Sequence, residues 1–122
     1  MPLDWAMAQM NLGNALYSLG IRESGTEKLE EAVKAYREAL KEYTRECVPL
    51  DWANTWGNEG LALMALAERN GDADIARQAL DQLKEAESVL REGGHFTWAD
   101  TKKHQIPDAQ TLLDTLTSDT KA

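Results

Sequence analysis

The chain has 122 residues, enough for one domain, and its 43% of apolar residues is ordinary for a globular protein. Its formal net charge of −8, from 21 acidic and 13 basic residues, argues against binding to nucleic acid or to an anionic membrane surface. A neutral or basic partner is easier to accommodate. No apolar run approaches the ~18 residues of a membrane span, and no signal peptide is visible. Together with a single cysteine, Cys47, which fits a reducing compartment, these features predict a cytoplasmic protein.

The first unit of the chain, residues 2–48, is predicted to contain two helices. Asp4 is a candidate N-cap for the first helix, because its carboxylate can accept hydrogen bonds from the free amides of the first turn. Apolar residues at spacings of three and four follow, which is the period of a helix. Gly20 is expected to end this helix.

The second helix is predicted from a capping box and a long apolar stripe. Ser24 and Glu27 have the spacing at which two side chains satisfy the backbone amides of a helix start. The stripe of apolar residues continues to Tyr43, with charged residues on the other side. Pro49 is expected to force the chain out of this helix.

The start of the chain is repeated in its middle. Residues 2–6 recur letter for letter as residues 49–53, and small and apolar residues match further along at the same offset of 47 positions. A repeat of this period is typical of stacked supersecondary units. The second unit, residues 49–94, is therefore predicted to contain a third helix capped by Asp51, a turn at residues 70–72, and a fourth helix that stops at two glycines.

A third, degenerate copy of the motif, Thr-Trp-Ala at residues 97–99, lies near the start of a partial unit at residues 95–116. Its threonine and Asp100 can cap a fifth helix that covers the open face of the second hairpin. Pro107 lies inside this segment and either bends the helix or begins a separate short one. Residues 117–122 are predicted to be a polar, frayed tail.

Two segments of the first unit carry a resemblance to a known family. Residues 12–17 read LGNALY, Gly20 follows, and residues 31–40 read EAVKAYREAL. This pattern resembles the tetratricopeptide repeat, in which small residues let helices approach closely and large ones fill the gaps. The resemblance covers residues 2 to about 92 well and the remainder weakly, in a long-period variant of about 42–47 residues. It implies an all-α solenoid of antiparallel helix hairpins, a single domain of two and a half units with a C-terminal capping helix.

One residue departs from this pattern. Glu59 stands where the first unit has Leu12, and an acid at a packing position is costly to bury without a partner. We expect Glu59 to tilt toward solvent or to pair locally. The alternative is that it faces a groove or a partner.

The usual role of this family, implied by the resemblance alone, is to bind a peptide or partner segment in a concave groove lined by the first helix of each unit. The groove residues carried over from the first two units are almost uncharged: Met7, Met10, Asn11, Asn14, Tyr17, Asn54, Gly57, Asn58, Leu61 and Met64. The third unit adds Thr101, His104, Gln105, Asp108 and Leu112. Methionine adapts to varied apolar side chains and asparagine can both donate and accept, which suits an extended, weakly charged peptide. The alternative is that methionine and leucine at this spacing only pack within the fold.

One subfamily of these repeats grips an acidic C-terminal peptide with two asparagines and several cations. Asn14 and Asn58 match the asparagine positions, whereas Met10, His104 and Asp108 stand where that subfamily has basic residues. Without cations, a peptide carboxylate loses its charge-assisted hydrogen bonds. We therefore expect a protein or peptide partner that is neutral or basic, and not a partner held by that clamp.

The tryptophan of the repeated motif indicates an alternative function. By analogy with the later copies, Trp5 has no preceding helix to pack on, so Leu3, Trp5 and nearby apolar groups are predicted to form an exposed patch at an uncapped end. Either the chain is a piece of a longer array, or another copy covers this end. Because two and a half units offer little core, a self-association module that forms a homo-oligomer would also gain stability.

The residues give catalysis little support. His104 lies four positions from both Asp100 and Asp108, which is a weak metal-binding or acid–base arrangement. The other histidine is His95, and Cys47 is most simply a spare thiol. No glycine-rich phosphate loop and no nucleophile motif is present. We expect a protein that is not an enzyme and that uses no cofactor or metal.

Overall fold

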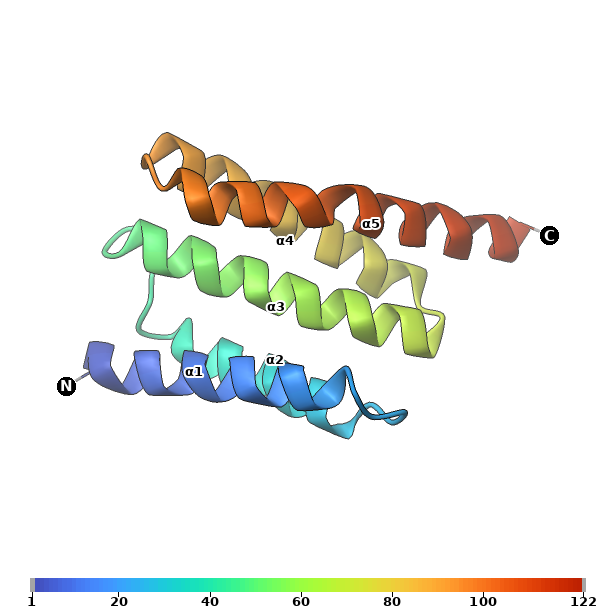
Figure 1. Ribbon diagram of the computed structural model, residues 1–122, viewed down its shortest axis with the longest axis horizontal. Coiled ribbons are helices and arrows are strands. Elements are labelled where there is room, and N and C mark those ends of the chain that lie inside the picture. Colours follow the sequence, from blue (N-terminus) through green and yellow to red (C-terminus); the bar gives the residue numbers. More distant parts are fainter. Residues whose placement is uncertain (1, 122) are drawn as a thin grey trace.

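The computed structural model describes residues 2–121 and shows helices packed against one another. These are α1 (Pro2–Gly20), α2 (Glu27–Ala39), α3 (Pro49–Asn70), α4 (Ala73–Glu92) and α5 (Phe96–Lys121), and the described chain contains no strand. In Figure 1, α1, α3 and α5 lie side by side in one row, and α2 and α4 lie behind them. The predicted all-α class and the predicted five helices are thus confirmed. None of the helices in the described chain combines the length and apolar character that crossing a membrane requires.

The core lies between successive helices. Each helix packs on the next one along the chain, and α3 also contacts α1 and α5. The largest buried cluster joins α2 to α3, with Leu29 and Tyr36 on one side and Leu63 on the other. A second cluster joins α4 to α5 through Leu83 and Leu113. The apolar stripes of α2 and α4 are therefore buried, and this burial holds the helices together.

The first hairpin depends on close approaches at two glycines of α1. The ring of Tyr36 lies over Gly13, where a Cβ atom would be 2.6 Å from the Tyr36 Cε1 atom. At Gly20, a Cβ atom would be 2.8 Å from the side chain of Leu29. Because these positions carry no side chain, α2 packs directly on the backbone of α1.

The starts of three helices differ from the prediction. α1 and α3 begin at Pro2 and Pro49, and Asp4 and Asp51 lie in their first turns instead of at the N-cap. A proline is favourable at the first helical position because its φ angle is preset and its missing N–H would have had no partner there. The acids behind it meet the positive end of the helix dipole. At α2 the predicted capping box is absent, since the N-cap is Thr26 and makes no side-chain cap hydrogen bond.

The second helix is shorter than predicted. α2 ends at Ala39, and residues 40–48 form turns before Pro49. Tyr43 lies in these turns, yet it is 5% exposed and packs with Ala6 of α1. The prediction that the helical stripe continues through Tyr43 is therefore wrong. Tyr43 is buried because the turn covers the start of α1.

The turns around α4 agree with the prediction. Gly71 adopts a φ angle of 66° after α3, and Asp72 caps α4 by accepting hydrogen bonds from the N–H groups of Asp74 and Ile75. α4 then stops before Gly93. Glycine suits the left-handed conformation after α3, because a side chain there would be strained.

α5 is a single helix, although Pro107 lies inside it. A proline there removes one backbone hydrogen bond, and the packing of Ala109 and Leu113 on α4 offsets this loss. Of the two alternatives for Pro107, the structure shows the continuous helix. Of the predicted polar tail, residues 117–121 belong to α5, and residue 122 lies outside the described residues.

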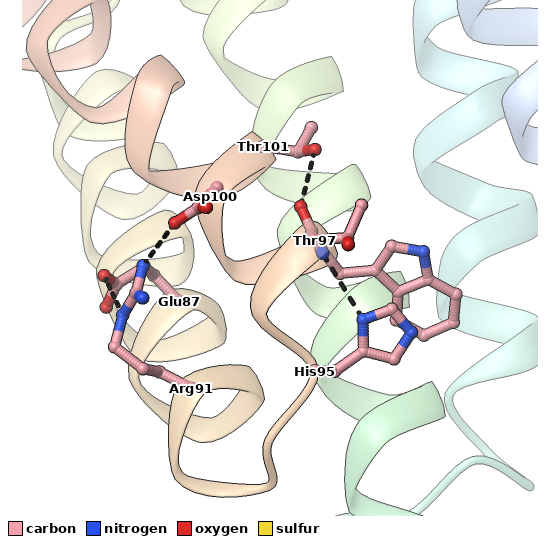
Figure 2. Close-up of polar contacts among 7 residues, drawn as sticks. Glu87, Arg91, His95, Thr97, Asp100 and Thr101 are labelled. Carbon is pink, nitrogen blue, oxygen red and sulfur yellow. Dashed lines mark hydrogen bonds and ion pairs between the residues drawn. The ribbon is translucent and has the colours of Figure 1, made fainter.

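Figure 2 shows the junction between α4 and α5. His95 is the N-cap of α5: its Nδ1 atom accepts a hydrogen bond from the Trp98 N–H at 3.3 Å, and the two rings stack with centroids 3.8 Å apart. Thr97, the predicted cap, instead accepts a hydrogen bond from the Thr101 hydroxyl at its backbone carbonyl. The cap is therefore two positions earlier than the predicted one.

The link between α1 and α2 is tied to the end of α3. The Arg69 guanidinium donates hydrogen bonds to the backbone carbonyls of Gly20 at 2.7 Å, of Ile21 at 3.2 Å and of Gly25. These carbonyls lie at and beyond the C-terminal end of α1, where a positive charge also meets the negative end of the helix dipole. Arg69 thus holds the link against the second hairpin.

Candidate functional site

A hollow of about 300 Å³ lies where α1, α2 and α3 meet. Its lining consists of polar and aromatic side chains with one leucine: Asn14, Tyr17, Ser18, Tyr36, Asn58 and Leu61. Four of these, Asn14, Tyr17, Asn58 and Leu61, are predicted groove residues. They come together because α1 and α3 contact each other, and Asn58 donates a hydrogen bond to Asn14 across this contact.

A chain of hydrogen bonds runs through the wall of this hollow. The Tyr36 hydroxyl donates to Asn14 Oδ1 at 2.6 Å, and Asn58 Nδ2 donates to the same oxygen at 3.3 Å. Asn58 Oδ1 in turn accepts from Lys102 Nζ at 2.6 Å. The chain links α2, α1, α3 and α5, so the fold itself fixes the orientation of both amides.

Lys102 belongs to this wall although the sequence did not indicate it as a site residue, and the same holds for Ser18 and Tyr36 of the lining. Lys102 is 3% exposed, and its side chain lies against Gly57, where a Cβ atom would be 2.6 Å from Lys102 Cε. Burial lowers the pKa of its amine to about 8. The one hint in the sequence is that Gly57 stands where the first unit has Met10, which leaves space for another side chain.

The hydroxyl groups of the hollow stay protonated at neutral pH. Burial raises the pKa of Tyr17, and burial followed by the nearby Tyr17 raises that of Tyr36. Within the described chain, no hydrogen bond involves the Tyr17 hydroxyl or the Asn14 side-chain nitrogen. The hollow therefore offers a hydroxyl and an amide N–H to a ligand, whereas both amide oxygens are already engaged.

The other predicted groove residues lie elsewhere. The Met10 sulfur accepts hydrogen bonds from Thr55 Oγ1 at 3.1 Å and from Asn54 Nδ2 at 3.9 Å, so Met10 and Asn54 join α1 to α3. Met64 packs against the buried clusters. Met7 and Asn11 are exposed and do not line the hollow.

The third unit contributes none of its predicted groove residues to the hollow. Thr101, His104 and Asp108 are exposed, Gln105 is half-buried, and Leu112 packs against the cluster between α4 and α5.

Glu59 is buried and paired with Arg37, so of the two expected outcomes, a tilt toward solvent or pairing with a neighbour, the structure shows the pairing. It is 1% exposed, and Oε2 lies 3.5 Å from the Nε atom of Arg37 on α2. Burial raises the pKa of the Glu59 carboxyl, while the charge and hydrogen bond of Arg37 and a hydrogen bond with Gln82 act in the opposite direction. The acid therefore takes part in packing α3 on its neighbours.

Leu3 and Trp5, the two named residues of the predicted exposed patch, are 49% and 41% exposed on α1. Two positions apart in a helix, they lie on nearly opposite sides of it and do not form one continuous patch. Cys47, in the turns before α3, is an exposed free thiol.

Asp100, one of the two carboxylates close to His104 in the sequence, is paired with Arg91. Figure 2 shows Arg91 between Glu87 and Asp100, with Arg91 Nε 3.0 Å from Glu87 Oε1 and a terminal nitrogen 2.9 Å from Asp100 Oδ1. The hydrogen bond from Arg91 lowers the pKa of Asp100. Among the described residues, no three His, Cys, Asp or Glu side chains form a group that could hold a metal ion.

No protein-family model matches the chain, and searches of curated proteins and of solved structures likewise give no match.

Proposed function

We propose that the five helices are two and a half stacked hairpins of the tetratricopeptide-repeat type, and that the stack is a protein-interaction module. The order of contacts supports this arrangement, because α3 packs on both helices of the first hairpin and α5 on both helices of the second. Gly13 and Gly60, which are equivalent in the repeat, both lie where one helix of a hairpin approaches the other closely.

The proposed binding site is the hollow at the junction of α1, α2 and α3. The observation that carries the proposal is that Asn14, Tyr17, Asn58 and Leu61 line one depression, with the amides held in place by hydrogen bonds. Side chains that are fixed before binding lose little conformational entropy when a ligand arrives.

The chemistry of the hollow favours a neutral or basic peptide segment. The free Tyr17 hydroxyl and the Asn14 amide N–H can bond to a peptide backbone, and Leu61 provides an apolar contact. No lining residue carries a charge, the Lys102 amine is buried behind Asn58, and the chain has a net charge of −8. An acidic peptide would approach this surface against repulsion. A cytoplasmic location is part of the proposal, and the exposed thiol of Cys47 supports it.

The test fills the hollow without disturbing its hydrogen bonds. Ser18 lines the hollow and is exposed, so Ser18→Arg should obstruct a ligand and leave the fold intact. The matched control is Ser88→Arg, the same change at an exposed position of α4 outside the hollow. Truncation of Asn14 or Asn58 suits the test poorly, because it would leave Tyr36 or Lys102 without its hydrogen-bond partner.

The probes are short random linear peptides displayed on phage and selected against the full chain. We expect the enriched peptides to be poor in acidic residues and to bind the Ser88→Arg variant as tightly as the original chain. Their affinity for the Ser18→Arg variant should be lower by a factor of about ten or more. Fluorescence anisotropy of the synthesised peptides measures these affinities. If no peptide is enriched, or if both variants bind equally well, the hollow is not a peptide site.

A further inference from the structure

α1 is poor in charge and carries an exposed apolar face. It contains 19 residues with Asp4 as its single charged side chain, and the polar residues Asn11, Asn14 and Ser18 lie on one side of the helix. On another side, Leu12 and Leu19 are each 49% exposed, and Trp5 is 41% exposed. The apolar face of a helix is usually buried. One face of α1 therefore has more apolar surface than the described chain covers.

The internal repeat shows how the equivalent face of α3 is covered. Leu12 corresponds to Glu59, which is 1% exposed, and Leu19 corresponds to Leu66, which is 6% exposed. In α3 this face is packed against α2, through Arg37 at Glu59 and through the large buried cluster at Leu66. No described element takes the corresponding place on α1.

The open face of α1 forms a regular stripe of five residues. They are spaced alternately by three and four positions: Trp5, Ala8, Leu12, Ala15 and Leu19. This spacing is the one at which two helices pack along a straight seam, and the two alanines allow a close approach. The stripe excludes Leu3, which lies on another side of α1 at about 100° per residue.

The stripe continues into a hollow of about 370 Å³ between α1 and α2. On the α1 side it is lined by Leu12, Leu16 and a glutamine, and on the α2 side by Glu31, Lys34 and Glu38 around an alanine. The rim thus carries both signs of charge, with a lysine between two acids in the sequence of α2. No ion pair to Lys34 is found among the described residues.

We propose that this face binds the same face of a second copy of the chain, with the two α1 helices antiparallel about a two-fold axis. A two-fold contact brings a patch against itself, so the patch must be self-complementary. The rim fulfils this condition, because Lys34 of one copy can meet Glu31 or Glu38 of the other. Leu12 is equivalent to Glu59, which contacts Arg37. Because leucine is apolar, its neighbour at this place should be apolar too, and Leu12 of the second copy meets this requirement.

Charge also favours this face over the rest of the surface. The chain has a net charge of −8, so two copies repel each other on average. α1 contributes only Asp4 to that charge, at its end. Two copies can therefore approach most easily with their α1 helices together.

The size of the face indicates a weak dimer. From Trp5 to Leu19 the stripe is ~21 Å long, and two adjacent helices are ~20 Å wide. The contact thus buries roughly 800 Å² of projected surface, counted over both copies, and more once the relief of the side chains is included. This area is near the lower end for specific protein interfaces. We expect a dissociation constant in the micromolar range.

The first test measures the mass of the full chain by light scattering and sedimentation equilibrium from ~1 μM to ~1 mM. The mass should rise from the 13.6 kDa of one chain toward twice that value. Leu12→Glu should raise the dissociation constant about a hundredfold or more, because a two-fold contact carries the change twice. Phe96→Glu is the matched control, since Phe96 is 58% exposed at the start of α5 and outside the face. Helical circular dichroism confirms that each variant is folded.

The second test exchanges the charges of the rim. Lys34→Glu makes the rim entirely acidic, and the double variant Glu31→Lys with Glu38→Lys makes it entirely basic. Each should self-associate at least about tenfold more weakly than the original chain, and an equimolar mixture of the two should form mixed dimers. Ser18→Arg changes a residue about 100° around α1 from the centre of the stripe and should leave the dimer unchanged, which separates this surface from the proposed peptide site.

A constant mass of 13.6 kDa at all concentrations would overturn the proposal and leave the face free for another protein. A mass that grows beyond two copies would exclude the two-fold arrangement. Equal loss of association in Leu12→Glu and Phe96→Glu, or failure of the mixed charge variants to associate, would show that the interface lies elsewhere.

Discussion

Lys102 carries an amine into a part of the fold that has no counter-ion for it. It is 3% exposed, and its hydrogen bond goes to the neutral Asn58 Oδ1 at 2.6 Å. Among the described residues no carboxylate forms an ion pair with it. Because the protonated amine is poorly solvated there, its pKa falls from 10.5 to about 8. The charge of Lys102 therefore costs free energy in the folded state at neutral pH.

The stability of the protein should rise with pH because of Lys102. Between about pH 8 and 10.5 the unfolded chain keeps this lysine protonated while the folded chain has released the proton, so the unfolded state binds more protons and the free energy of unfolding increases. Relative to the Lys102→Met variant, in which this position does not titrate, the free energy of unfolding of the original chain should increase by about 2 kcal/mol between pH 7.5 and 9.5. Urea unfolding over this range measures it. Lys103→Met, at an exposed neighbour, should behave like the original chain, and a flat profile for all three would contradict the burial argument.

The sequence predicts four of the six residues that line the candidate site. Asn14 lies three positions, about one helical turn, beyond the repeat equivalent of Asn58, and stacking of the first helices brings the two asparagines into contact. Lys102 could not be identified in the same way, because it differs from the exposed Lys103 only through the rotation of α5 about its axis. That rotation follows from the packing of α5 on α4, and the periodicity of apolar residues in a segment that contains Pro107 does not fix it.

At the scale of elements, the start of α5 depends on one side chain. His95 accepts the Trp98 N–H and stacks on the Trp98 ring, as Figure 2 shows. His95→Ala should lower the free energy of unfolding by about 1 kcal/mol, and His95→Asn should recover most of the cap. Thr97→Ala should have a smaller effect, because no oxygen of Thr97 accepts a hydrogen bond from the backbone amides of the first turn. Amide hydrogen exchange in the first turn of α5 compares the two alanine variants, and an equal effect of both would contradict the assignment of His95 as the cap.

The prediction of the elements succeeds in their interiors and fails at their ends. Apolar periodicity identifies the helices because packing requires it, as at Leu29 and Leu83. Their ends depend on competing local interactions. Tyr43 continues the helical stripe in the sequence, although the chain has already turned back over Ala6. Nothing in the spacing distinguishes a residue that is buried by a helix from one that is buried by a turn.

At the scale of the whole molecule, the glycines of α1 set the distance between the helices of the first hairpin. In Gly13→Ala the new methyl group would meet the Tyr36 ring at 2.6 Å, and Tyr36 is 1% exposed, so the ring has little room to move. We expect a net loss of about 1–2 kcal/mol, although alanine favours a helix by itself. Chemical unfolding measures it. Gly25→Ala is the control, since nothing lies within 4 Å of its Cβ position and the change should be within about 0.5 kcal/mol.

The contact between Arg69 and the link after α1 gives the chain an order of folding. α1 and α2 can pair as soon as both have formed, since a short segment separates them. The carbonyls of Gly20 and Gly25, however, accept hydrogen bonds from Arg69, which is 49 positions from Gly20 and 44 positions from Gly25. These bonds can form only when α3 has packed on the first hairpin. Closing so long a loop is slower than closing a hairpin. The helices of the first hairpin are therefore expected to pair early, and the link between them to become ordered only after α3 has docked.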